Sequence, residues 1–135
     1  MSIVGESIES SGLTVTARSA LHGMIKGFAV SGYKIITPLA IDIDQNDYSP
    51  NGFDDATSIR LSSTVPVNIS GMTAGQDGGV KRLINVGSQA ITILHASALS
   101  YAANRFVCSG AANITINPDS MLVIYYDGVT KRWRA

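Results

Sequence analysis

The strongest β-structure signal in this chain is the stretch Met121-Leu-Val-Ile-Tyr-Tyr-Asp-Gly-Val-Thr-Lys-Arg-Trp-Arg-Ala135. Its first half is a run of aliphatic, β-branched and aromatic residues, which favour strands. Asp127-Gly128 then supplies a tight turn, and a second short run carries Trp133, the only tryptophan in the sequence. The stretch predicts a β-hairpin that closes the molecule, with the rest of the chain packed beneath it.

Short apolar runs of the same kind recur from residue 33 onward, separated by glycine, proline, asparagine and aspartate. Ser58–Leu61 and Asn113–Ile116 alternate apolar and polar residues, as in a sheet with one face to solvent. We predict an all-β fold over residues 33–135, an antiparallel β-sandwich or jelly-roll-like domain with almost no helix and no repeat of fixed period. The predicted strands lie in Tyr33–Ile43, Thr57–Leu61, Val65–Ile69, Val80–Val86, Ala90–Leu94, Arg105–Cys108, Ala112–Ile116 and Met121–Tyr126.

Residues 1–32 have a different character and are predicted to form an extended N-terminal arm or linker. They are rich in serine and glycine, and most of their apolar residues follow no clean period. Residues 17–28 do match helical spacing, although Gly23 and Gly27 each cost a helix about 1 kcal/mol. Two interpretations stay open: an arm that orders when it docks on a partner, or a strand that completes the domain's own sheet. If the arm docks, the predicted contact residues are Ile3, Val4, Ile8 and Leu13.

The composition limits the partners of the protein. A chain of 135 residues buries roughly two thirds of its surface as one domain, so it needs no disulfide or metal to fold. Ten basic and ten acidic residues cancel, so we expect no nucleic-acid and no membrane partner. The sequence shows neither a secretion signal nor a membrane span. A charged fraction of 15%, below the roughly 25% that is usual, suits a surface that packs against other proteins.

Metal and cofactor signals are weak. The acidic stretch Asp42–Asp47 invites comparison with a calcium loop, but the glycine and glutamate that the EF-hand pattern requires at its sixth and twelfth positions are Asp47 and Phe53 here. His22 and His95 are far apart and lack the spacing of transition-metal ligands. We therefore predict no metal site and no cofactor.

Catalytic signals are equally weak, so we predict no enzyme. There is no Gly-x-Ser-x-Gly elbow, and Ser31–Lys34 matches Ser-x-x-Lys without the partner motifs of that family. Gly75–Gly79 lacks the Lys-Ser/Thr of a phosphate loop and is predicted to be a hairpin turn. The single cysteine, Cys108, lies in a strand-like run and is predicted to be a small buried hydrophobe.

Four residues are predicted to have structural roles. Asn85 suits a turn, because its amide can hydrogen-bond its own backbone. Arg105 and Phe106 begin a strand, where the guanidinium can satisfy loop carbonyls while its stem covers apolar surface. Trp133 needs a partner for its indole N–H and is expected near a core edge. The basic residues around it could touch phosphates, but the zero net charge favours a capped strand end.

A succession of short motifs runs through residues 40–135. These motifs are Ser58-Ile-Arg-Leu61, Asn68-Ile-Ser-Gly71, Gln76-Asp-Gly78, Leu83-Ile-Asn-Val-Gly-Ser88, Ile91-Thr-Ile-Leu-His95, Asn104-Arg-Phe106 and Tyr126-Asp followed by Arg132-Trp-Arg134. Together they resemble a β domain of tailed-bacteriophage virion proteins, which occurs in capsid decoration proteins and in tail-fibre or spike proteins. The resemblance implies a β-sandwich or jelly-roll that commonly assembles as a trimer. It does not cover the first thirty residues.

Two functions follow as expectations. The first is a capsid decoration (cement) protein, made in the host cytoplasm, whose homotrimers bind the major capsid protein on the outside of the virion. The apolar residues of the N-terminal arm and a short chain without a fibrous shaft favour it. The second is a fibre or spike module that recognises host glycans through loops at Asp44–Asp55 and Ala96–Asn104, where Tyr48, Phe53 and Tyr101 would line the site.

Overall fold

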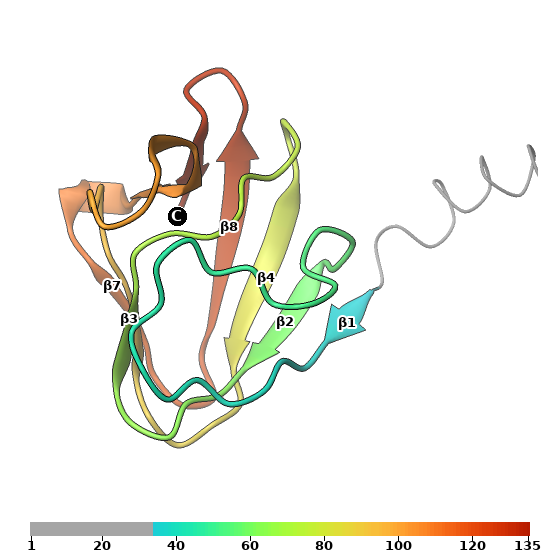
Figure 1. Cartoon of the computed structure of the whole chain (residues 1–135), viewed down its shortest axis with the longest axis vertical. Coiled ribbons are helices and arrows are strands. Elements are labelled where there is room, and N and C mark those ends of the chain that lie inside the picture. Colours follow the sequence, from blue (N-terminus) through green and yellow to red (C-terminus); the bar gives the residue numbers. More distant parts are fainter. Residues whose placement is uncertain (1–33) are drawn as a thin grey trace, which may run out of the picture. The chain divides into compact units, whose positions relative to one another are not determined.

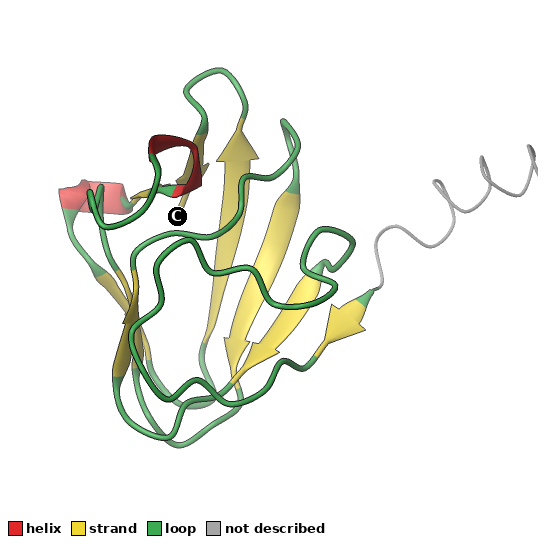
Figure 2. Cartoon of the chain, viewed as in Figure 1, coloured by secondary structure: helices red, strands yellow, loops and turns green. Residues whose placement is uncertain are grey.

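The structure, a computed structural model, describes residues 34–135. The predicted arm, its helix over residues 17–28 and the contact residues Ile3, Val4, Ile8 and Leu13 lie outside the described residues. Strands dominate the described part, and its helical segments are two short 3₁₀ turns, η2 (Ala102–Asn104) and η3 (Ser109–Ala111). The fold is therefore β-rich (Figure 2).

The strands form two sheets, seen on opposite sides in Figure 1. The larger sheet has six strands, in the order β1 (Ile35–Ile36), β2 (Ser58–Leu61), β4 (Val80–Asn85), β8 (Met121–Asp127), β9 (Arg132–Arg134) and β6 (Phe106–Val107). The smaller sheet has three, in the order β3 (Val67–Ile69), β5 (Ile91–Ile93) and β7 (Ile114–Ile116).

The hairpin predicted from the closing stretch is confirmed. β8 and β9 pair antiparallel, with Tyr126 opposite Trp133 and Asp127 opposite Arg132. The other predicted strands also contain observed ones, but the run from Tyr33 to Ile43 is much shorter than expected. Only Ile35–Ile36 forms a strand there, since Pro38 has no N–H to continue a ladder.

The predicted antiparallel pairing is wrong for about half of the sheet contacts. β1–β2, β2–β4, β3–β5 and β6–β9 are parallel, whereas β4–β8, β5–β7 and β8–β9 are antiparallel. The physical reason is the path of the chain, which alternates between the two sheets from β2 to β8. From β1 to β5, each passage to the other sheet and back brings the next strand in parallel to its predecessor in the same sheet, whereas β7 returns antiparallel to β5.

This path winds the first half of the domain into a parallel coil with a nearly constant step along the sequence. On one side of the coil, Ile36 pairs with Ile59, and Ile59 pairs in turn with Leu83. On the other side, Gln45 bridges to Ile69, and Ile69 pairs with Ile93. The structure thus has a period that is not visible in the sequence, because the residues at equivalent positions differ.

The core lies between the sheets. Its buried side chains come from both, with Ile59, Leu83 and Trp133 contributed by the larger sheet and Ile69 and Ile93 by the smaller one. Each of these five is 0% exposed. The inward residues alternate with outward ones along the strands, so the larger sheet has a second face that the core does not use.

Candidate functional site

The outward face of the larger sheet carries a row of exposed apolar side chains, and we call it the outer sheet face. Strand alternation places them there: in β4 and β8 every second residue is buried or partly buried on the core side, and the residues between them point away. Val80, Met121, Val123 and Tyr125 are between 43% and 56% exposed. The outer sheet face consists of Ile35, Arg60, Val80, Arg82, Ile84, Met121, Val123, Tyr125 and Arg134.

The register brings these side chains together across β4 and β8. Val80 lies opposite Tyr125, Arg82 opposite Val123, and Ile84 opposite Met121. Directly opposed residues on one face of a sheet lie close enough to touch. The face therefore presents a continuous apolar patch in which a central arginine is flanked by aliphatic side chains.

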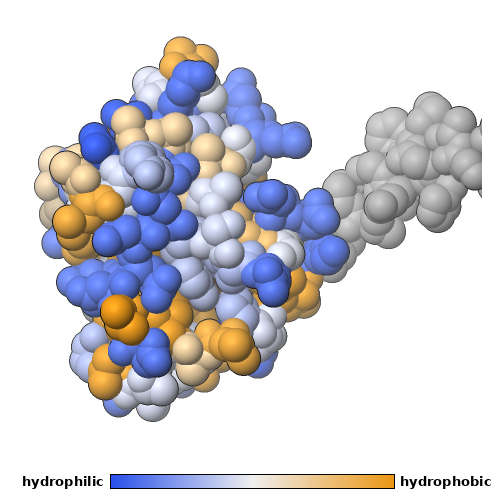
Figure 3. Space-filling model, viewed as in Figure 1, coloured by the Kyte–Doolittle hydropathy of each residue, from blue (hydrophilic) through white to orange (hydrophobic). Residues whose placement is uncertain are grey.

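The charge of this face is positive. Among residues 34–135, neither Arg60 nor Arg82 has a side-chain hydrogen bond or ion pair. Arg134 is paired with Asp127. On a chain of zero net charge, the uneven distribution leaves unpaired cations on an apolar surface. Apolar and hydrophilic patches are also interspersed on the side of the domain seen in Figure 3.

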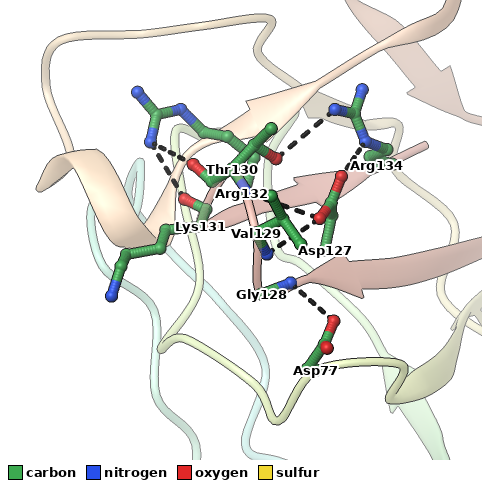
Figure 4. Close-up of polar contacts among 8 residues, drawn as sticks. All are labelled: Asp77, Asp127, Gly128, Val129, Thr130, Lys131, Arg132 and Arg134. Carbon is green, nitrogen blue, oxygen red and sulfur yellow. Dashed lines mark hydrogen bonds and ion pairs between the residues drawn. The ribbon is translucent and has the colours of Figure 1, made fainter.

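The hairpin tip between β8 and β9 is fixed by carboxylates (Figure 4). Asp127 Oδ1 accepts hydrogen bonds from the backbone N–H groups of Val129 and Thr130, at 3.0 and 3.3 Å. Its Oδ2 accepts from Nε of Arg134 at 2.8 Å, and this ion pair, with the backbone donors, lowers the pKa of Asp127 to about 2. Asp77 accepts from the N–H of Gly128 at 2.8 Å. The tip is a capped strand end, as predicted.

Trp133 is more deeply placed than predicted. It was expected near a core edge, but its side chain is 0% exposed, because β6 pairs on the far side of β9 and makes β9 an inner strand. Its ring contacts Tyr126 and Phe53 edge to face, with centroids 5.0 and 6.0 Å apart. The indole N–H finds the predicted partner in the carbonyls of Met72 and Thr73, each at 3.2 Å. A side chain buried in this way does not stack on a nucleic-acid base.

The other three structural residues behave as predicted. Asn85 Oδ1 accepts from the N–H of Gly87 at 3.0 Å, which closes the predicted turn. Its Nδ2 also donates to the carbonyl of Ile116 at 2.8 Å, a contact between the two sheets. Arg105 Nε donates to the loop carbonyl of Ser100 at 2.9 Å, and Phe106 is 0% exposed in the core.

Carboxylates in the acidic stretch Asp42–Asp47 hold neighbouring segments in place through hydrogen bonds. Asp47 Oδ1 accepts hydrogen bonds from the N–H of Tyr101 at 2.8 Å and from Nδ2 of Asn104 at 2.9 Å. Asp44 Oδ1 accepts from the N–H of Asn68 at 2.8 Å. These bonds tie the two predicted long loops to each other and to the small sheet. Within residues 34–135, no group of three or more His, Cys, Asp or Glu side chains is arranged to hold a metal ion.

The aromatic residues predicted to line a glycan site are not together on the surface. Phe53 is 2% exposed and belongs to the core, so this part of the prediction is wrong. Tyr48 is half-buried, and burial raises its pKa. Tyr101 is 77% exposed and remains available to a ligand.

Two smaller predictions concern Gly75–Gly79 and Cys108. The glycine-rich segment is a turn, closed by a hydrogen bond of 2.8 Å from the Gly79 N–H to the carbonyl of Gln76. It links strands of different sheets, however, and is therefore not a hairpin turn.

Cys108 is buried, as predicted, and burial raises the pKa of its thiol. The backbone N–H of Cys108 donates to Nδ1 of His95 at 3.0 Å, so His95 is engaged in a structural contact.

Sequence reasoning missed Lys81, a lysine on the inward side of β4 that is 7% exposed. Its Nζ donates to the carbonyls of Ala56, Phe53 and Asp54, at 2.6, 2.7 and 3.3 Å, and lies 4.6 Å from the centroid of the Phe53 ring. Burial lowers the pKa of Lys81, while Asp54 and Asp55 oppose the shift. The alternation of β4 was the available signal, because it places residue 81 on the same side as Leu83.

Comparisons with family models, with curated proteins and with solved structures found no match for this chain. No helix in residues 34–135 combines the length and the apolar character that crossing a membrane requires.

Proposed function

We propose that this chain is a structural protein of a tailed-bacteriophage virion, a decoration (cement) protein that binds the assembled head and stabilises the contacts between capsomers. In this proposal the domain is a variant of the β-sandwich or jelly-roll, assembles as a homotrimer and lies on the capsid exterior. Its partners are its own copies and the major capsid protein. The proposal assigns it no catalytic step, cofactor, nucleic acid or membrane.

The outer sheet face is the observation that carries this proposal. Contiguous apolar patches are uncommon on monomeric soluble proteins and mark contact sites. Here the patch lies on a rigid sheet, and its register pairs place Arg82 and Val123 side by side at the centre. Arginine among apolar residues is typical of protein–protein interfaces, in which lysine and acidic residues are depleted.

The positive charge of the outer sheet face indicates which kind of surface contacts it. A two-fold contact of this face with itself would bring Arg60 and Arg82 of one copy against the same residues of another, and such like-charge contacts are unfavourable. A contact with a different surface, one that supplies carboxylates, avoids this cost. Between copies, contacts of that kind form a closed ring such as a trimer when the rotation from one copy to the next closes; they can also attach the domain to another protein. Several copies binding one shell would add avidity.

The alternative is a tail-fibre or spike module that recognises host glycans through its loops. Tyr101 and Leu99, which are 77% and 65% exposed, favour it. The burial of Phe53 in the core weighs against it, since one exposed aromatic ring offers little stacking surface to a sugar.

Co-sedimentation with assembled empty heads tests the proposal. The full chain is mixed with heads of the phage that encodes it and, separately, with unassembled major capsid protein. Binding to the assembled heads alone is expected. The double variant R60E/R82E should bind heads at least about tenfold more weakly, because each reversal removes a cation that the partner neutralises.

The matched control is K131E, which reverses an exposed cation on the hairpin tip, away from the outer sheet face. It should bind heads like the unaltered chain, and all three proteins should melt at similar temperatures. Absence of head binding by the unaltered chain, or equal binding by R60E/R82E, would overturn the proposal.

A further inference from the structure

The turn at residues 50–53 contains the only Asn-Gly pair in the sequence. The backbone N–H of Phe53 donates to the carbonyl of Pro50 at 3.0 Å, and Gly52 has a φ of +82°, which glycine adopts without steric cost. Asn51 and Gly52 are both exposed, whereas Phe53 is 2% exposed. The pair therefore lies at the surface of a turn whose next residue is fixed in the core.

The reactive groups of this pair are free. Among residues 34–135, the side-chain amide of Asn51 makes no hydrogen bond and the backbone N–H of Gly52 donates none. Because glycine has no Cβ, its nitrogen can approach the preceding side chain more closely than that of another residue. An asparagine carboxamide followed by an unhindered backbone nitrogen is the arrangement from which a succinimide ring forms.

We propose that Asn51 is a site of spontaneous deamidation. The backbone nitrogen of Gly52 attacks Cγ of Asn51 and forms an N–C bond; its proton passes to the side-chain nitrogen, which leaves as ammonia. Water then opens the succinimide at either carbonyl and gives aspartate or isoaspartate, each with a new negative charge. The chain and water are the only reactants. The inference is independent of the proposed function.

The other asparagines of residues 34–135 are less suited to this reaction. Each is followed by a residue larger than glycine, and Asn117 precedes Pro118, whose nitrogen carries no hydrogen. The amide of Asn85 donates to the carbonyl of Ile116 at 2.8 Å, and that of Asn104 donates to a carboxylate at 2.9 Å. We therefore expect a single modified asparagine in this part of the chain.

Two Asp-Gly pairs in the same residues provide an internal comparison, because aspartate cyclises onto a following glycine with loss of water. The fold restrains both pairs. The N–H of Gly78 donates to the carbonyl of Tyr126 at 2.9 Å, and the N–H of Gly128 donates to Asp77 Oδ1 at 2.8 Å. Both carboxylate oxygens of Asp127 accept hydrogen bonds. These pairs should react slowly as long as the domain is folded.

The isoaspartyl product has a consequence for the fold, because its main chain runs through Cβ and is one carbon atom longer at residue 51. The anchors beside it are close. The ring of Phe53 contacts Trp133 edge to face, and its carbonyl accepts a hydrogen bond from Nζ of Lys81 at 2.7 Å. A longer turn would displace these contacts, so the isoaspartyl form should be less stable than the original chain.

Incubation of the full chain in oxygen-18 water, with the domain either folded or unfolded in urea, tests the inference. Mass spectrometry of proteolytic peptides should show a gain of about three daltons on the peptide with Asn51, since a heavy hydroxyl replaces the amino group. Both aspartate and isoaspartate should form, because direct hydrolysis of the amide would give aspartate alone. In the folded chain Asn51 should react within about tenfold of its rate in urea, whereas Asp77 and Asp127 should isomerise at least about tenfold more slowly than in urea.

The matched control is N51Q, which keeps the amide but must close a larger ring and so reacts more slowly. After equal incubation of the folded proteins, the isoaspartyl fraction of the unaltered chain should melt at least about 3 °C below the fresh protein, while N51Q keeps its mass and its Tm. Protection of Asn51 by folding to the same degree as Asp127, or aspartate as the sole product, would overturn the inference. An equal fall in Tm for N51Q would contradict the effect on the turn.

Discussion

Arg82 of β4 lies directly opposite Val123 of β8 on the outer sheet face. Among the described residues the guanidinium has no carboxylate partner, and the side chain of Val123 is 48% exposed beside it. A cation and an aliphatic side chain in this arrangement add little to the stability of the isolated domain. They suit a surface that a partner covers, and the proposed attachment to a virion shell depends on this property.

The substitution Val123→Asp should weaken association while leaving the stability of the fold nearly unchanged. The residue is exposed, so the free energy of unfolding should change by no more than about 1 kcal/mol. Head binding should weaken at least about tenfold, because a carboxylate replaces the centre of the apolar patch and pairs with the cation that the partner would neutralise. Urea unfolding and co-sedimentation measure the two effects. Thr115→Asp, on the exposed side of β7, is the control, and equal losses of head binding in both variants would contradict the role of the outer sheet face.

Lys81→Met should destabilise the domain by about 2–4 kcal/mol. The substitution keeps most of the side-chain volume but deprives three carbonyls, those of Phe53, Asp54 and Ala56, of a charged donor. Chemical unfolding followed by circular dichroism measures the loss. Lys131→Met, an exposed site, should change stability by less than about 0.5 kcal/mol. If both variants were equally stable, the hydrogen bonds of Lys81 would not hold the loop before β2.

Gly75→Ala should cost about 1–3 kcal/mol through a clash with the tryptophan ring. A Cβ at this position would lie 2.8 Å from Cη2 and 3.0 Å from Cζ2 of Trp133. Phenylalanine lacks these two atoms, so in a Trp133→Phe background the same change should cost markedly less. A double-mutant cycle from urea unfolding measures the coupling. Additive effects would mean that the two residues do not touch in this way.

Asp127 should give the domain an acid-dependent component of stability. Its pKa is lowered from 3.8 to about 2, chiefly by the ion pair with Arg134. The stabilisation is therefore complete above about pH 4 and is lost as the pH falls toward about 2. In Asp127→Asn, the difference in Tm from the unaltered protein should shrink over this range. Asp42→Asn, which removes an exposed carboxylate that has no side-chain partner among residues 34–135, is the control for the loss of one negative charge. A constant difference for Asp127→Asn would contradict the assignment.

Local features of the fold could be predicted from the sequence. The apolar and β-branched content of Met121–Tyr126 and the turn at Asp127-Gly128 defined the hairpin, because both act over a few residues. The Asx turn at Asn85 and the loop contact of Arg105 were readable for the same reason.

The order of the strands could not be predicted from the sequence, because it depends on contacts between residues that lie far apart along the chain. The parallel pairing of Ile36 with Ile59 follows from the passage of the chain through the other sheet, which leaves no local mark. The depth of Trp133 follows likewise from β6 closing the far side of β9. The burial of Lys81 could not be predicted, because lysine is rarely buried and only its three carbonyl partners make that position favourable.

The candidate site was only partly readable. The sequence pointed to the N-terminal arm and to aromatic loops, whereas the structure draws attention to the outer sheet face. Alternation could have located Val80 and Arg82 on one side of their strand, but their neighbours Tyr125 and Val123 appear only once the register of β4 and β8 is known.

The position of the protein on an intact virion tests the proposed function most directly. Cryo-electron microscopy of the phage that encodes the chain should show density for the β domain on the outside of the capsid, in trimers over the junctions between capsomers. Density at the tail, with none on the shell, would contradict the decoration role and support the adhesion alternative.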